Sequence, residues 1–282
     1  MRPSKPYHAY TDYHREPSGL LRLDVIVEAI ERHAHERAAK RLRVLDVGCG
    51  CGNISLPIAS LGHEVVGVDL DPESIRIAAE RNPFPDRARF LAARAEDLDL
   101  RQPFDAIVAS EVVEHVPEPF KLLSDLRRAL KPDGIMIVTI PNGASWEERM
   151  RRFLIHTATG RRIRAFLRRT LLTAREDQVQ TKSRHSPHLH FWRLGPFVRA
   201  LERVGLRVVR VEKNGAWFKQ LHTFFLRFVL RRGSALFHKL DERDARACRR
   251  LPVHRALGWI LVCTPTTQAP ADKRFDSGRL PG

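Results

Sequence analysis

The sequence predicts an α/β protein in which parallel strands alternate with helices, interrupted by two helical insertions. Short runs of β-branched residues recur between helix-length segments, a glycine-rich turn follows the first run, and two further runs close the chain. Hydrophobic residues make up 43% of the 282 residues, which is enough to bury a core. Composition therefore excludes a wholly disordered basic tail.

The first element that we expect is an amphipathic helix in the segment LLRLDVIVEAIERHAHERAAKR. Its apolar residues recur at helical spacing and it ends in basic residues. The strands expected after it are RVLDV (43–47), EVVGVD (64–69), RFLAA (89–93), DAIVAS (105–110), IMIVTI (135–140), LRVVRVE (206–212) and LGWILVCT (257–264).

Proline and glycine mark the ends of the intervening helices. Asp71-Pro72 begins one helix, and Pro117 or Pro119 begins another that ends at 131–134. A further helix is expected over about 194–204, before Gly205. These signals divide the chain into an N-terminal helical segment (1–42), a core (43–145), a basic insertion or lid (146–190), a C-terminal completion of the sheet (191–264) with a helical insertion at about 217–252, and a tail expected to be disordered (265–282).

The net charge of +16 is unevenly distributed along the chain. Residues 1–145 carry 19 basic and 22 acidic side chains, whereas residues 146–282 carry 30 and 11. Such an asymmetry suggests an anionic partner, which could be a nucleic acid, an acidic lipid surface or an anionic substrate. A soluble basic face would give the same count.

The cysteines and the hydropathy pattern bear on where the protein works. Four cysteines in a chain of this length make a poor disulfide framework, so a reducing, cytoplasmic setting is expected. No stretch approaches the roughly 18 apolar residues that a membrane-spanning helix needs. We therefore expect a cytoplasmic protein that is soluble or peripheral to a membrane.

The segment VLDVGCGCGNI (44–54) carries the clearest chemical signal. A buried strand leads into G-x-G-x-G, where glycines let a ligand lie against the backbone and a helix N-terminus offers free N–H groups. The next strand ends in Asp69, whose carboxylate can accept hydrogen bonds from both ribose hydroxyls. Asp46 would repel a pyrophosphate but attract an ammonium, so the pattern favours S-adenosylmethionine over a dinucleotide.

At these residues the sequence resembles the class I S-adenosylmethionine-dependent methyltransferases, in the group that includes the ubiquinone-biosynthesis O-methyltransferases. The motifs VLDVGCGCGN, VVGVDLDPESI, ARAEDL, FDAIVASEVVEHVPEP and LKPDGIMIVTIPN occur in order. The resemblance implies a Rossmann-like sheet of seven strands, mostly parallel with the last strand antiparallel. It also implies cofactor contacts from Asp46 (ammonium), Gly48, Gly50 and Gly52 (methionine part), Asp69 (ribose), Ala95 and Glu96 (adenine) and Ser110 (floor).

The candidate catalytic residues follow the fourth strand in SEVVEHV. If the acceptor is a hydroxyl, Glu111 or His115 could remove its proton. In the family the matching Glu111, Glu114 and His115 are associated with a divalent metal such as Mg²⁺, although relatives that need no metal share Glu-His, which can also cap and pack the next helix. His185, His188 and His190 could form a second metal cluster or only a loop.

The expected acceptor is a hydroxyl of a small molecule, with lipid-linked molecules and glycan precursors as the candidates. The chain lacks the N/D-P-P-Y/F element typical of base-methylating enzymes, so nucleic acid is less favoured; RNA methylation and a non-catalytic module that binds S-adenosylmethionine stay open as alternatives. The aromatic and basic residues of 217–238 predict either a lid over the site or a helix on an anionic membrane surface.

Overall fold

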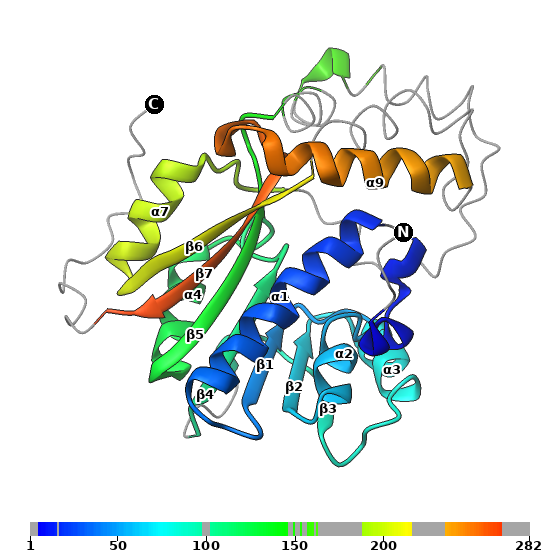
Figure 1. Ribbon diagram of the computed structural model, residues 1–282. Coiled ribbons are helices and arrows are strands. Elements are labelled where there is room, and N and C mark those ends of the chain that lie inside the picture. Colours follow the sequence, from blue (N-terminus) through cyan, green and yellow to red (C-terminus); the bar gives the residue numbers. More distant parts are fainter. Residues whose placement is uncertain are drawn as a thin grey trace.

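The computed structural model describes residues 5–15, 17–97, 102–145, 149, 153, 157–160, 162, 188–215 and 235–266. Seven strands form one sheet in the order β3-β2-β1-β4-β5-β7-β6 (Figure 1). The strands are β1 (Arg43–Val47), β2 (Glu64–Asp69), β3 (Ala88–Ala92), β4 (Phe104–Ser110), β5 (Leu130–Pro141), β6 (Leu206–Asn214) and β7 (Gly258–Pro265).

The first five strands are parallel to one another, and β7 runs antiparallel between β5 and β6. This arrangement confirms the Rossmann-like sheet with an antiparallel last strand. The parallel strands β1, β2 and β4 are buried almost throughout, and β4 reads as an almost uninterrupted apolar run, as expected where both faces of a sheet are covered.

Helices lie on both faces of the sheet. The α-helices are α1 (Pro17–Glu36), α2 (Ser55–Ser60), α3 (Pro72–Glu80), α4 (Pro119–Ala129), α7 (Leu194–Arg203) and α9 (Ala235–Arg250), and 3₁₀ turns occur at η1 (Pro6–Tyr10), η2 (Asp12–Arg15), η3 (Ala95–Asp97) and η6 (Val253–Arg255). The predicted start of α3 is confirmed, because Pro72 is its first residue and the Asp71 carboxylate accepts a hydrogen bond from the Ser74 backbone N–H.

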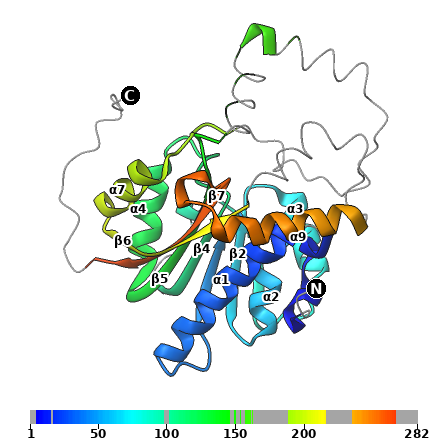
Figure 2. The same ribbon diagram turned by 45° about the horizontal axis from the view of Figure 1, so that its top comes forward.

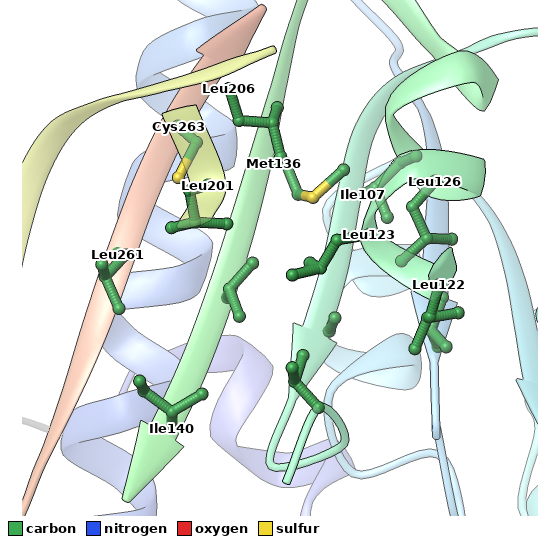
Figure 3. Close-up of a cluster of buried hydrophobic side chains, with 14 of the residues drawn as sticks. Ile107, Leu122, Leu123, Leu126, Met136, Ile140, Leu201, Leu206, Leu261 and Cys263 are labelled. Carbon is green, nitrogen blue, oxygen red and sulfur yellow. The ribbon is translucent and has the colours of Figure 1, made fainter. Parts of the chain in front are cut away.

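Alternating side chains of the strands feed two apolar clusters. Val44 of β1 packs with α1 and α2 in one cluster, whereas Leu45 packs with α4 and α7 in the other. Figure 3 shows the second cluster, in which Leu123 and Leu126 of α4 face Met136 of β5. The two clusters hold the sheet rigid between its helical layers.

The beginning of β5 differs from the sequence prediction. The motif 131–134, predicted to end the preceding helix, instead lies inside β5, which starts at Leu130, and the pairing shifts between Phe104 and Ala106 of β4. Gly134 is needed in this irregular stretch because an added Cβ would lie 2.8 Å from the Asp105 carbonyl oxygen. The Lys131 ammonium, 2.7 Å from the Asp105 carboxylate, ties the two strands together there.

Two segments outside the core pack around α1. The N-terminal turn η1 is anchored by Asp24, whose carboxylate accepts a hydrogen bond of 2.7 Å from the Tyr7 hydroxyl and lies 2.7 Å from the His8 ring Nε2. On the other side α9 packs across α1 at an angle (Figure 2). The insertion predicted at about 217–252 is described only from residue 235 onward. Its first part, 217–234, which was predicted to form a lid or a membrane-surface helix and includes Trp217, Phe224 and Phe228, lies outside the described residues.

Within the described part of the chain, no helix has both the length and the apolar character required to cross a membrane. Most of the basic insertion (146–190) and nearly all of the tail (265–282) fall outside the described residues.

Candidate functional site

The glycine turn lies where β1 ends, between the carboxyl ends of β2 and β4. Strand β1 pairs with β2 on one side and β4 on the other, so the order of the sheet reverses at this point. Loops leaving neighbouring strands in opposite directions open a crevice there, which is where ligands bind in open α/β sheets. The turn is held to β2 by hydrogen bonds from the backbone N–H groups of Gly48 and Cys49 to the Val68 carbonyl oxygen.

The three glycines of the turn all have positive φ angles, but their surroundings differ. Gly48, at φ +68°, has no room for a side chain, because an added Cβ would lie 2.4 Å from Cγ2 of Val112. Gly50, at φ +51°, faces open space, since an added Cβ would meet no atom within 4 Å. Gly52, at φ +80°, packs against Leu56 and Phe90. The half-buried backbone at Gly50, which has open space where a side chain would lie, is therefore a surface that a ligand can approach.

Asp69 ends β2 beside this open backbone. Its two carboxylate oxygens accept hydrogen bonds of 2.9 Å from the backbone N–H groups of Gly50 and Asp71. These two bonds fix the carboxylate in orientation and leave lone pairs for a ligand's hydroxyl groups. The position agrees with the predicted ribose contact, which stays a prediction.

Asp46 lies inside β1 and is 1% exposed. One oxygen accepts a hydrogen bond of 2.6 Å from the Ser55 hydroxyl at the start of α2, and the other has no hydrogen-bond partner among the described residues. Burial raises the pKa of this carboxyl to about 7, and the nearby Asp69 charge adds to the rise while Ser55 opposes it. A cationic ligand group near Asp46 would favour its ionised form.

The end of β4 brings Ser110 and Glu111 against Thr139 of β5. The Thr139 hydroxyl donates a hydrogen bond of 2.9 Å to the Glu111 carboxylate and lies 3.1 Å from the Ser110 hydroxyl. The Glu111 backbone is left-handed, at φ +58°, a conformation that costs a non-glycine residue about 1–3 kcal/mol. Strain of this size at the mouth of the crevice is typical of functional sites.

Arg22 enters the same site from helix α1. Its guanidinium lies 3.7 Å from the Glu111 carboxylate and donates a hydrogen bond of 3.2 Å to the Tyr13 hydroxyl. The side chain is only 15% exposed. No local motif marks Arg22 in the sequence, because almost ninety residues separate it from Glu111.

The two residues predicted to border the adenine ring follow β3 in η3. Ala95 is buried in the cluster under α4, and Glu96 is the central residue of the turn. The turn therefore lies beyond the carboxyl ends of β3 and β2, on the Asp69 side of the crevice.

Glu114 and His115 form a separate group with His188, which precedes α7. One ligand atom from each side chain lies within 4.8 Å of the other two. The His115 and His188 rings contact edge to face with centroids 4.8 Å apart, and the Glu114 side chain is fully buried. Glu111, predicted to join Glu114 and His115 at a metal, does not belong to this group and instead contacts Thr139 and Arg22. His185 lies outside the described residues, and the His190 ring contacts the Val116 carbonyl oxygen.

A seven-stranded Rossmann-like sheet with a glycine turn after β1, one carboxylate inside β1 and another at the end of β2 is typical of the class I S-adenosylmethionine-dependent methyltransferases. Comparison with known families agrees: the chain belongs to the methyltransferase domain family, whose model matches residues 20–211.

Curated relatives include ubiquinone biosynthesis O-methyltransferases. The chain is 37% identical to the Azorhizobium caulinodans enzyme over 129 residues and 38% identical to the Cereibacter sphaeroides enzyme over 130 residues. Each match covers 43% of this chain, and 51% and 52% of the relative. The chain thus spans about half the length of the curated relatives it matches.

Solved structures share the fold at low sequence identity. A putative sarcosine dimethylglycine methyltransferase from Galdieria sulphuraria has a TM-score of 0.54 and 16% identity, over 85% of this chain and 86% of that one. YcgJ from Bacillus subtilis has a TM-score of 0.52 and 18% identity, over 88% of this chain and 99% of that one. These likenesses support the fold.

Proposed function

We propose that this chain transfers the methyl group of S-adenosylmethionine to a hydroxyl of a small molecule. The observation that carries the proposal is the open backbone at Gly50 beside the fixed carboxylate of Asp69, at the reversal point of the sheet. The names of the curated relatives support an oxygen as the methylated atom. A family match over residues 20–211 supports the cofactor.

Each predicted cofactor contact has a physical role in this proposal. The backbone of Gly48, Gly50 and Gly52 supports the methionine part, and Asp46 balances its ammonium. Asp69 accepts hydrogen bonds from the ribose, the Ala95–Glu96 turn borders the adenine, and Ser110 lines the floor. Arg22 adds a cation suited to the cofactor carboxylate.

The transfer itself is an in-line displacement. The acceptor oxygen forms a bond to the methyl carbon while the carbon–sulfur bond breaks and its electron pair stays on sulfur, which leaves S-adenosylhomocysteine. The hydroxyl proton passes to a base, for which Glu111 and His115 are the candidates. Because the sulfonium carbon is already activated, the protein mainly aligns the two reactants and excludes water.

Binding of the cofactor can be tested by calorimetry on Asp69→Ala. The variant should bind S-adenosylmethionine at least about tenfold more weakly, because each lost hydrogen bond from the ribose to a charged group contributes about 1.5–3 kcal/mol. Asp71→Ala is a matched control, since it removes a carboxylate two residues away that caps α3 by accepting hydrogen bonds from Ser74. Undiminished affinity in Asp69→Ala would refute the ribose assignment.

The acceptor can be sought with S-adenosylmethionine labelled in the methyl group. The label should appear in the small-molecule or lipid fraction of a cell extract. The labelled product should carry its methyl group on an oxygen atom. We include lipid-linked acceptors because the basic residues of 146–282 would suit an anionic surface. Label in an RNase-sensitive fraction would favour RNA methylation, and cofactor binding without labelling of any fraction would favour a binding module.

A further inference from the structure

We propose that the outer face of helix α9 docks on a membrane surface that contains anionic phospholipids. This face carries four cationic side chains, which we call the α9 basic stripe: Lys239, Arg243, Arg246 and Arg250. Docking itself does not depend on the chemistry of methyl transfer, whereas its use in reaching a lipid-linked acceptor rests on the proposed function.

The basic stripe lies on the side of α9 that faces away from the rest of the protein. An α-helix turns by about 100° per residue, so the four residues of the stripe fall within about 60° of one another around the axis. The buried residues Phe237, Asp244 and Cys248 fall on the other side, where α9 contacts α1 and β6. Figure 1 shows α9 on the outside of the molecule, across α1. All four cations are exposed, along about 17 Å of the helix.

The charges of the stripe are not balanced within the described part of the chain, where none of its side chains forms an ion pair or a hydrogen bond. On α3, by contrast, the exposed Arg76 contacts the carboxylates of Glu73 and Glu80. Successive members of the stripe are four, three and four residues apart, and like charges at this spacing on a helix repel. The half-buried Glu242 lies beside the stripe and offsets one charge of the four. An anionic surface would relieve the remaining repulsion.

The outer face of α9 suits a lipid surface better than a nucleic acid. Leu236, next to the N-terminal end of the stripe, is 56% exposed, and an apolar side chain in this position can enter the membrane interface. Single-stranded nucleic acids are commonly bound through aromatic side chains on which bases stack, and the described side chains of this face include none. A straight row of cations also contacts a flat surface along its whole length.

The end of α9 is fixed at the edge of the sheet where the cofactor crevice opens. The Cys248 thiol donates a hydrogen bond of 2.9 Å to the carbonyl oxygen of Gly215, which directly follows β6. The end of β6 pairs with Gly258 of β7, and Gly258 also pairs with Pro141, the last residue of β5. The carboxyl ends of β5, β4 and β1 lie at the same edge because these strands are parallel. Docking through α9 would therefore hold this edge near the lipid surface.

The test measures co-sedimentation of the full chain with vesicles of equimolar phosphatidylglycerol and phosphatidylcholine. The wild type should bind these vesicles and should bind vesicles of phosphatidylcholine alone much more weakly. Each basic side chain at an anionic membrane contributes a factor of about five to the binding constant, so Arg243→Gln combined with Arg246→Gln should bind about 25-fold more weakly. Both residues are exposed, so the free energy of unfolding should change little.

The matched control changes the charge by the same amount on the other side of the sheet. Arg199→Gln combined with Arg203→Gln alters two exposed residues of α7, which packs on the face opposite α1. This variant should bind the anionic vesicles nearly as the wild type does. Equal losses in the two double variants would show attraction by net charge alone and would overturn the assignment to α9.

Two further results would also overturn the proposal. One is that the wild type does not bind the anionic vesicles. The other is that the stripe variant loses affinity for single-stranded RNA but not for vesicles, which would assign the face to a nucleic acid. Asp69→Ala, which is expected to weaken cofactor binding, should bind vesicles as the wild type does, and the stripe variant should keep its affinity for S-adenosylmethionine in calorimetry. The docking surface and the proposed function can thus fail separately.

Discussion

At the scale of single residues, the site combines side chains with very different sequence signals. The glycines of the turn and the acids Asp46 and Asp69 could be predicted from the sequence, because short-range motifs encode a turn and the end of a strand. Arg22 could not be predicted, and the sequence grouped His188 with His185 and His190 instead of with Glu114 and His115, since both side chains reach their neighbours through tertiary packing. The strained Glu111 backbone also has no local signature.

The glycine turn leads to a prediction that separates folding from binding. Gly50→Ala should fold, at a cost of about 1–2 kcal/mol for an alanine in the left-handed region, yet bind S-adenosylmethionine much more weakly because the new methyl occupies the ligand face. Gly48→Ala should be less stable than Gly50→Ala, because it adds a clash with Val112 to the same strain. Urea unfolding and calorimetry measure the two effects. Wild-type affinity in Gly50→Ala would contradict this account of the turn.

Asp46 leads to a prediction about pH. Its pKa is raised from 3.8 to about 7 in the folded protein, so between these values the folded chain holds a proton that the unfolded chain releases. The free energy of unfolding without cofactor should therefore fall as the pH rises through this window, by up to about 1.4 kcal/mol per pH unit. Asp46→Asn should remove this dependence of the unfolding free energy on pH, as measured by urea unfolding from pH 4 to 8. The neighbouring Asp69, Cys49 and Ser55 are unchanged in this variant.

The same titration has the opposite effect on binding. Since the ionised carboxylate attracts the cofactor ammonium, affinity for S-adenosylmethionine should increase from pH 6 to 8 in the wild type and change less in Asp46→Asn. If the wild type and Asp46→Asn show the same dependence on pH, both in the free energy of unfolding and in affinity for S-adenosylmethionine, Asp46 does not titrate as inferred.

At the scale of elements, all seven strands and the main helices of the core follow from the sequence pattern. Uninterrupted apolar runs and the prolines that begin α3 and α4 carry that information. The early start of β5 could not be predicted, because Pro132 and Gly134 usually end regular structure and here lie in a strand with an irregular register. Pairing with Phe104 outweighs this local tendency.

Helix α4 provides a prediction about packing. Leu123 is fully buried between α4 and β5, so Leu123→Ala should lower the free energy of unfolding by about 2–5 kcal/mol. Lys121→Ala, on the same helix but largely exposed, should change it by less than about 0.5–1 kcal/mol. Chemical denaturation measures both. Equal losses would show that this helix does not contribute its buried face to the core.

At the scale of the whole molecule, the excess positive charge lies outside the part of the chain that forms the cofactor site. Residues 1–145 have three more acidic than basic side chains, and they include β1 to β5 and the glycine turn. The basic residues of 146–282 belong mostly to segments outside the described residues, so the partner that they meet stays a prediction. We therefore expect the charge to bear on the acceptor or its carrier, and less on the cofactor.

The position of β7 between β5 and β6 also affects the order in which the protein can assemble during synthesis. Among the described strands, β1 to β5 pair only with one another until residues 258–265 have left the ribosome, and β6 pairs only with β7. The cofactor crevice between β2, β1 and β4 can thus form while β5 still exposes an unpaired edge. A nascent chain halted before residue 258 would present that edge to other chains, so timely synthesis of the last strand protects the protein from aggregation.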